Sequence, residues 1–299
     1  MKKYLLGVGF LTVFSLIFSC AKKSEGQVVE ETYATGETSV YVEESIVPIF
    51  DDINNVFMST YDKAKIHIVP KTENEIVNYI LKDSVKLAVL PRKLNEKELK
   101  HFDGKKVVNQ TPFAKDAIIF VNSKSSNDSL VDVKTIIDLI KNPELKSEHV
   151  FVFDNINSSL TQFFKTKAGV SEFGENVYFA KDTKEVIDYI SKNNKAIGIV
   201  GINWLLQPDE DIQNLKQNLK SMLVLNESDN RYYMPTQSTI ADASYPLIRE
   251  LYIIEAQGTS GLGKGVSSFA ASDRGQRIVL KSGLFPYKQP TREIIINKN

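Results

Sequence analysis

From residue 39 onward, short apolar runs alternate with segments in which apolar residues recur every three to four positions. The first kind of segment is typical of buried strands, and the second is typical of one face of a helix. Strands that alternate with helices predict α/β layers with mostly parallel sheets. The predicted strands are Ser39–Val42, Lys65–Val69, Lys86–Leu90, Ala117–Asn122, His149–Phe153, Asn176–Phe179, Ala196–Val200, Ser221–Val224 and Leu251–Glu255.

Helical spacing occurs between these runs and again near the end of the chain. It is carried by Ile46, Ile49, Phe50, Ile53 and Phe57; by Ile76, Tyr79 and Ile80; by Val133, Ile136, Ile137 and Ile140; and by Val186, Ile187 and Ile190. Further helices are predicted at Pro246–Leu251, Gly263–Ala271 and Asp273–Ser282, and Ile294–Ile296 is expected to form a strand or an extended tail.

The first twenty residues have a different pattern. Lys2 and Lys3 precede an apolar run from Tyr4 to Phe18, and Ser19 precedes Cys20, the one cysteine of the chain. A positive start, an apolar stretch and a small residue before the break are the parts of an export signal. The run is shorter than the roughly 20 residues of a membrane-spanning helix, so we favour a signal peptide over residues 1–19 rather than an uncleaved anchor. Residues 16–20 resemble a lipobox, which implies acylation of Cys20.

Composition limits the function further. Lys+Arg and Asp+Glu number 37 each, so no basic excess argues for nucleic acid. The length after residue 19 is enough for two domains. Residues 20–38 are polar and read as a flexible tether, because such a segment buries too little apolar surface to offset its ordering entropy. We therefore expect a lipid-anchored protein of the bacterial cell envelope.

Catalytic signatures do not appear in the sequence. The three histidines, His67, His101 and His149, do not form a metal-binding pattern, and no GxSxG elbow or P-loop is present. The glycine-rich run 261–265 does not follow a strand, so we interpret it as a turn before a helix. These observations favour binding over catalysis, with no cofactor.

Two predicted strand-to-helix junctions have the features of an anion site. Ser45 is a plausible N-cap with Pro48 in the first turn, and Asn157, Ser158 and Ser159 precede another apolar helix. A helix N-terminus offers free N–H groups and partial positive charge to an anion. An ordinary capped helix is the alternative at each junction.

Several strings matter through their order along the chain. They are Glu44–Ile49, Lys86–Arg92 with Glu96–Glu98, Asp116–Asn122, Asn157–Ser159 with Thr161 and Phe164, Ala196–Gly201, and finally Ser268-Phe269, Ser272–Gln276 and Gly283–Pro286. In this order they resemble the type II periplasmic solute-binding proteins, and in particular their phosphate-binding, PstS-like branch, over about residues 37–298.

The resemblance implies an α/β fold of two lobes, joined by two interdomain crossovers, with a ligand in the central cleft. Lobe 1 would combine residues 37–118 and 230–299, and lobe 2 would span residues 119–229. The crossing strands would lie near Ala117–Asn122 and Arg231–Ile240. The two helix starts would then face each other across the cleft.

The resemblance also implies roles for individual residues. Hydrogen-bond donors to the anion would be Ser45, Thr72, Ser158 and Ser159, with Asn155 and Asn157 orienting them. Arg92 would either clamp an oxyanion or pair with Glu96.

Two acidic residues depart from the family pattern, because Glu43 and Glu44 stand where the family has small hydroxyl residues. A carboxylate about 4 Å from an anion repels it by roughly 4 kcal/mol at an effective dielectric of about 20. Glu44 therefore either points away or accepts the proton of monohydrogen phosphate, a role that an aspartate plays in the family at the position of Lys86.

These inferences predict a lipid-anchored solute-binding protein that captures phosphate or a similar oxyanion and passes it to an ABC transporter permease. It would be a monomer, it would not be an enzyme, and it would meet the membrane through its N-terminal lipid. The alternative is a degenerate copy of the same fold that acts as an envelope interaction or sensing protein without binding phosphate.

Overall fold

The computed structural model describes residues 31–142, 144–256 and 260–291. The predicted signal peptide, Cys20, most of the predicted tether and Ile294–Ile296 lie outside the described residues. Within the described ranges, every helix is too short or too polar to cross a membrane.

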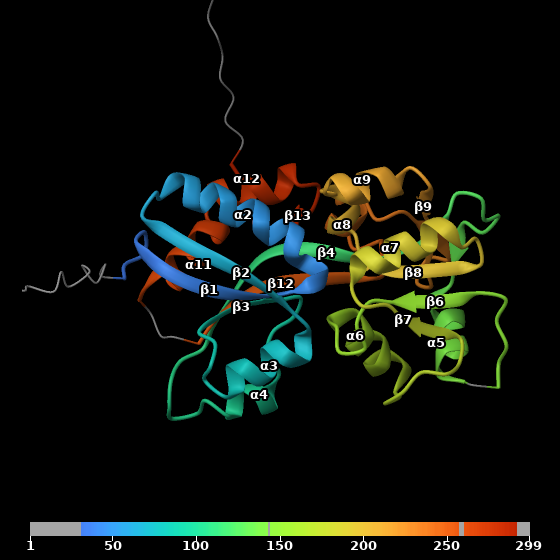
Figure 1. Ribbon diagram of the computed structural model, residues 1–299, viewed down its shortest axis with the longest axis horizontal. Helices are drawn as coiled ribbons and strands as arrows, with labels where there is room; N and C mark the ends of the chain where they lie inside the picture. Colours follow the sequence, from blue (N-terminus) through green and yellow to red (C-terminus); the bar gives the residue numbers. More distant parts are fainter. Residues whose placement is uncertain (1–30, 143, 257–259, 292–299) are drawn as a thin grey trace, which may run out of the picture. The chain divides into compact units, whose positions relative to one another are not determined.

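A ten-stranded sheet forms the centre of the fold, in the order β2-β1-β3-β12-β4-β8-β6-β7, with β13 and β9 also paired to β4 (Figure 1). Its strands are β1 (Gly36–Glu43), β2 (Ala64–Lys71), β3 (Leu87–Leu90), β4 (Asn109–Ser123), β6 (Val150–Phe153), β7 (Val177–Phe179), β8 (Ala196–Gly201), β9 (Leu219–Ser221), β12 (Ile248–Glu255) and β13 (Phe285–Pro286). A second, three-stranded sheet joins β5 (Leu130–Val131), β10 (Leu223–Asn226) and β11 (Arg231–Tyr233).

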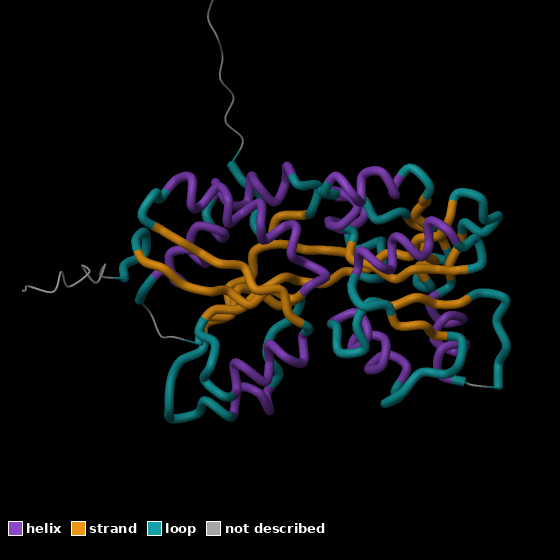
Figure 2. The backbone as a smooth tube through the Cα atoms, viewed as in Figure 1, coloured by secondary structure: helices purple, strands orange, loops and turns teal. Residues whose placement is uncertain are grey.

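Helices lie on both sides of the strands (Figure 2). They are α2 (Val47–Thr60), α3 (Glu73–Leu81), α4 (Glu96–Lys100), α5 (Val133–Lys141), α6 (Ser159–Ala168), α7 (Thr183–Lys192), α8 (Asn203–Leu206), α9 (Glu210–Lys216), α10 (Gln237–Ala241), α11 (Leu262–Ala271) and α12 (Asp273–Lys281), and a 3₁₀ turn, η1 (Glu44–Ile46), precedes α2. Helices α2, α11 and α12 pack on one another, and α3 contacts β1 and β3. In the other half, α7 contacts β8, β6 and α9, while α6 contacts β8 and α5.

The long strand β4 joins the two halves of the sheet. Its first part pairs with β12 and its later part pairs with β8, both antiparallel. Parallel pairing is confined to the flanks, where β1 lies between β2 and β3 and where β6 lies between β7 and β8. The α/β class is confirmed, but the expectation of a mostly parallel sheet is wrong at the centre. The predicted division into lobes 37–118 plus 230–299 and 119–229 stays a prediction.

Three predicted elements need correction. The helix predicted at Pro246–Leu251 is wrong, because Ile248–Glu255 is a strand in which Arg249 and Leu251 are buried while Ile248 and Glu250 are half-buried. The strand predicted at Ser221–Val224 is two strands, which belong to different sheets. Strand β1 begins at Gly36, so residues 36–38 belong to the sheet and not to the tether.

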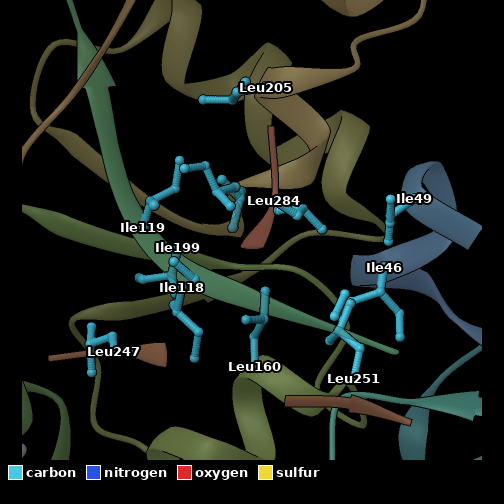
Figure 3. Packing of buried hydrophobic residues seen from close by; sticks show 14 of the residues in the cluster. Ile46, Ile49, Ile118, Ile119, Leu160, Ile199, Leu205, Leu247, Leu251 and Leu284 are labelled. Carbon is cyan, nitrogen blue, oxygen red and sulfur yellow. The ribbon is translucent and has the colours of Figure 1, made fainter. Parts of the chain in front are cut away.

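One hydrophobic cluster extends from the first half of the sheet into the second (Figure 3). It includes Ile46, which follows Ser45, and Leu160, which follows Ser159, and both are fully buried. Burying such a side chain contributes roughly 1.5–3 kcal/mol. Each helix start that was singled out in the sequence is therefore fixed in place by an apolar side chain directly after its serine.

Candidate functional site

The two predicted helix starts meet in the structure. The hydroxyl oxygens of Ser45 and Ser159 lie 3.2 Å apart although the residues are separated by 114 positions in the chain. Ser45 is fully buried and Ser159 is 3% exposed. Ser45 lies in η1 directly after β1, and Ser159 is the first residue of α6. The prediction that Ser45 is an N-cap is wrong, because the side chain of Glu43 caps η1. The fold therefore brings the N-terminal N–H groups of two separate elements to one point.

A carboxylate of the protein itself lies at this point. Glu43 is fully buried, and its Oε2 accepts hydrogen bonds from the backbone N–H of Ser45 at 3.0 Å and from the Ser45 hydroxyl at 2.5 Å. Its Oε1 accepts a hydrogen bond from the backbone N–H of Ser159 at 3.1 Å. One carboxylate thus receives donors from both helix starts.

Arg249 of β12 supplies the positive charge of a buried polar cluster that it forms with Glu43, Ser45, Ser159 and Asp116. Its Nη1 donates to the hydroxyl of Ser45 at 3.1 Å and to the hydroxyl of Ser159 at 3.0 Å. Its Nη2 donates to the carboxylate of Asp116 in β4. The Arg249 side chain is only 4% exposed and that of Asp116 is 0% exposed, so this ion pair is shielded from water and from salt.

Gly201, at the end of β8, allows this close packing. A Cβ atom at this position would lie 2.8 Å from the carbonyl oxygen of Ser45 and 3.0 Å from Nη2 of Arg249. The same carbonyl oxygen accepts a hydrogen bond from the Asn203 amide at 2.7 Å. The turn after β8 therefore positions Ser45 from the other half of the sheet.

The cluster holds more buried carboxyls than cations, because Glu43, Asp116 and Asp154 are buried and the guanidinium of Arg249 acts on all three. Burial raises the pKa of Glu43 and of Asp116, and the charge of Arg249 opposes this shift in both. The pKa of Asp154 lies well above its ordinary value because of burial and then the nearby charge of Glu43. Burial and the charge of Glu43 thus both favour the protonated form of Asp154.

Ser158 has a local role. Its hydroxyl oxygen accepts a hydrogen bond from the backbone N–H of Thr161 at 3.2 Å, which makes it the N-cap of α6. The hydroxyl proton is donated to the carboxyl of Asp154. Both hydrogen-bonding functions are used within the helix start, so Ser158 supports the position of Ser159.

Glu44 precedes Ser45 in η1, but its side chain does not take part in the hydrogen bonds between the two serines and Glu43. Its carbonyl oxygen accepts a hydrogen bond from Nε1 of Trp204 at 3.1 Å, and burial together with the charge of Glu43 raises its pKa to about 7. Its Oε2 has no hydrogen-bond partner among the described residues. The residue that contacts the helix starts is Glu43, which the sequence alone marks only as a departure from the family pattern.

The remaining predicted residues form the surroundings of the site. Thr72 caps α3 in a capping box with Glu75. The Asn155 side chain accepts a hydrogen bond from the backbone N–H of Asn157 at 2.9 Å, and the Asn157 carbonyl accepts one from the backbone N–H of Asn74 at 3.4 Å. These contacts hold the loop before α6 against the start of α3.

Arg92 is engaged in a salt-bridge network. Its Nε lies 2.7 Å from Oε1 of Glu73, and its Nη1 and Nη2 lie 2.9 and 3.0 Å from the carboxylate oxygens of Glu98. The expected pairing with Glu96 is therefore wrong, because Arg92 pairs with Glu73 and Glu98 instead.

A cavity of about 660 Å³ opens beside the cluster. Ser159 and Arg249 line it from the cluster, and its other lining residues are Glu73, Pro91, Arg92, Lys93, Gln162, Phe163, Thr166, Lys167, Ile248, Glu250 and Tyr252. The cavity is thus bounded by residues around α3, by α6 and by β12. No group of three or more His, Cys, Asp or Glu side chains that could hold a metal occurs among the described residues.

The arrangement defines a class of protein. A mixed α/β fold with antiparallel strands at its centre, parallel strands at its flanks and a cavity between its halves is the fold of the two-lobe periplasmic binding proteins. The sequence matches the PBP superfamily domain over residues 27–274, which is most of the chain. The protein therefore belongs to the PBP superfamily domain family, and the resemblance noted in the sequence is confirmed.

Individual relatives share a low sequence identity with this chain. The phosphate-binding protein PstS of Staphylococcus saprophyticus is 21% identical over 283 residues, which cover 90% of this chain and 85% of the relative. A Clostridium perfringens structure with bound phosphate, described as a phosphate ABC transporter substrate-binding protein, has a TM-score of 0.68 and 17% identity over 85% of this chain and 100% of that one. An ABC-type phosphate transport receptor from Vibrio cholerae has a TM-score of 0.61 and 14% identity over 83% and 99%.

Proposed function

We propose that the protein is an extracytoplasmic solute-binding protein that captures a small oxyanion, with phosphate as the first candidate, at the meeting point of η1 and α6. One observation carries this proposal: the backbone N–H groups of Ser45 and Ser159 converge within about 3 Å of one carboxylate, beside the buried guanidinium of Arg249. Donors arranged in this way stabilise a negatively charged oxygen. The relatives are named for phosphate binding or transport, which supports the same chemistry.

The proposal includes a division of labour between the halves of the protein. Lobe 1 (37–118 and 230–299) supplies Ser45 and Arg249, and lobe 2 (119–229) supplies Ser159. A ligand that uses donors from both lobes favours their closed arrangement. Capture requires no covalent step, which agrees with a family of non-enzymatic transport components.

Location and partners complete the proposal. Acylated Cys20 would anchor the monomeric protein to the membrane through the polar segment that ends before Gly36, within reach of an ABC transporter permease. The alternative, a binding-protein fold that has lost its ligand, has the position of Glu43 in its favour, but the names of the relatives do not favour it.

Isothermal titration calorimetry of the purified, ligand-stripped protein tests the proposal. We expect saturable heat with phosphate, and Ser158→Ala should weaken binding by about 1–2 kcal/mol because the start of α6 loses a hydrogen-bonded support. Ser272→Ala is the matched control, because Ser272 caps α12 in the same way and contacts none of the site residues described above. No heat at millimolar phosphate would contradict the proposal.

A further inference from the structure

We propose that Glu43 is a built-in competitor of the ligand: its carboxylate holds the oxyanion position in the unliganded protein, and an oxyanion binds only when this carboxylate leaves. The inference rests on the proposed function, because it concerns the same donors. It adds a residue that sets the affinity and the speed of capture.

The first argument is the number of donors. Three donors at the meeting point, the Ser45 N–H, the Ser45 hydroxyl and the Ser159 N–H, are directed at Glu43 over 2.5–3.1 Å. An N–H group donates one strong hydrogen bond. A carboxylate and an oxyanion ligand require the same donors, so they cannot both be fully bound there.

The second argument is charge. Glu43 is fully buried, and the positive charge that stabilises its carboxylate is that of Arg249, which also pairs with Asp116. If a dianion such as phosphate entered while Glu43 stayed ionised in place, two anions would share that guanidinium at close range, which is strongly unfavourable in a buried site. Exchange is therefore favoured over joint occupancy.

The third argument is access. Ser159 and Arg249 line the cavity, so a ligand in the cavity meets the cluster at these two residues. Arg249 keeps one buried group, Nε, without a hydrogen-bond partner among the described residues. This group is a donor that Glu43 does not use and that an entering oxyanion could recruit.

The test compares Glu43→Ala with the unaltered protein by titration with inorganic phosphate. Removing the competitor should tighten binding roughly ten- to a hundredfold, the range for hydrogen bonds to a charged group. Glu43→Gln should give a smaller gain, because an amide keeps one acceptor oxygen and loses the charge, and it carries the test if Glu43→Ala does not fold. Glu255→Gln is the matched control, since Glu255 is a buried carboxyl at the far end of β12, and its affinity should change by less than about twofold.

The rate of binding gives a second readout. Trp204 is the single tryptophan of the chain, and its indole N–H contacts the Glu44 carbonyl, next to the site. In stopped-flow fluorescence, the observed rate for the unaltered protein should reach a plateau as phosphate rises, because departure of Glu43 becomes limiting. The rate for Glu43→Ala should continue to rise linearly.

The outcomes separate the two proposals. Tighter binding by Glu43→Ala than by the unaltered protein supports the inference. Equal or weaker binding by folded Glu43→Ala and Glu43→Gln, while the unaltered protein binds phosphate, overturns the inference and leaves the proposed function intact. If neither the unaltered protein nor the folded variants give heat, both proposals are overturned.

Discussion

Replacing Arg249 tests how much its buried hydrogen bonds and charge contribute to the stability of the site. Its side chain is 4% exposed, and it contacts Ser45, Ser159 and Asp116 through its two terminal nitrogens. The variant Arg249→Met keeps much of the aliphatic volume and removes the charge together with all of these hydrogen bonds. The carboxylates of Asp116 and Glu43 then remain buried without a cation.

The magnitude follows from the burial of the pair. Removing one partner of a buried ion pair costs about 3–5 kcal/mol, because the other charge stays desolvated. Total stabilities of about 5–15 kcal/mol make this a large fraction. The loss should be smaller at pH 5 than at pH 8, because burial raises the pKa of both carboxyls and Arg249 no longer opposes the shift.

Urea unfolding monitored by circular dichroism measures this loss, and a double-mutant cycle isolates the pair. Asp116→Asn in the Arg249→Met background should recover about 2 kcal/mol, because the unpaired charge is gone. A loss below about 1 kcal/mol for Arg249→Met, or strictly additive effects of the two substitutions, would show that the Arg249–Asp116 pair contributes less to the free energy of unfolding than we expect.

Two further predictions concern Asp154 and Cys20. Because the pKa of Asp154 is raised in the folded state, the unfolded chain ionises first as pH rises above about 4, and stability falls by up to about 1.4 kcal/mol per pH unit until the folded pKa is reached. Asp154→Asn cannot ionise, so its stability relative to the unaltered protein should improve between pH 5 and pH 8 in urea unfolding, and a constant difference would contradict the assignment. Cys20→Ser should abolish membrane retention on cell fractionation and leave phosphate affinity unchanged; a fall in affinity would contradict the separation of anchor and site.

Local signals explain what could be predicted from the sequence. Ser158 could be predicted because a strand followed by a hydroxyl residue and a helical pattern is a short-range signature of a capped helix. The same signature pointed to Ser45, which lies at a helix start but is not the cap, because the Glu43 side chain takes that role. The order of such strings identified the family. Both signals depend on neighbours in the sequence, which is why they survive at low overall identity.

The residues that were missed depend on distant contacts. Arg249 lies three residues after Pro246 and directly before Glu250, a pattern that favours a short helix over a buried strand. Its partner Asp116 lies 133 positions away in the chain. The first part of β4 was missed because Pro112 and its polar neighbours argue against a strand. The structure accommodates this proline at an irregularity in the pairing, where the register shifts between Leu251 and Tyr252.

Glu43 shows a different limit. The sequence indicates an acidic pair before the helix but not which member turns inward. The choice depends on strand alternation and on the arrival of Ser159 from the other half of the protein. Its hydrogen bonds could not be inferred from β1 and η1 alone.

The most direct test of the central claim is a crystal structure of the protein grown with saturating phosphate. We expect tetrahedral density within hydrogen-bonding distance of the backbone N–H groups of Ser45 and Ser159, with the Glu43 carboxylate moved away from both. Density that shows Glu43 still bound to these groups, with no phosphate beside Arg249, would contradict the claim that this cluster is the oxyanion site.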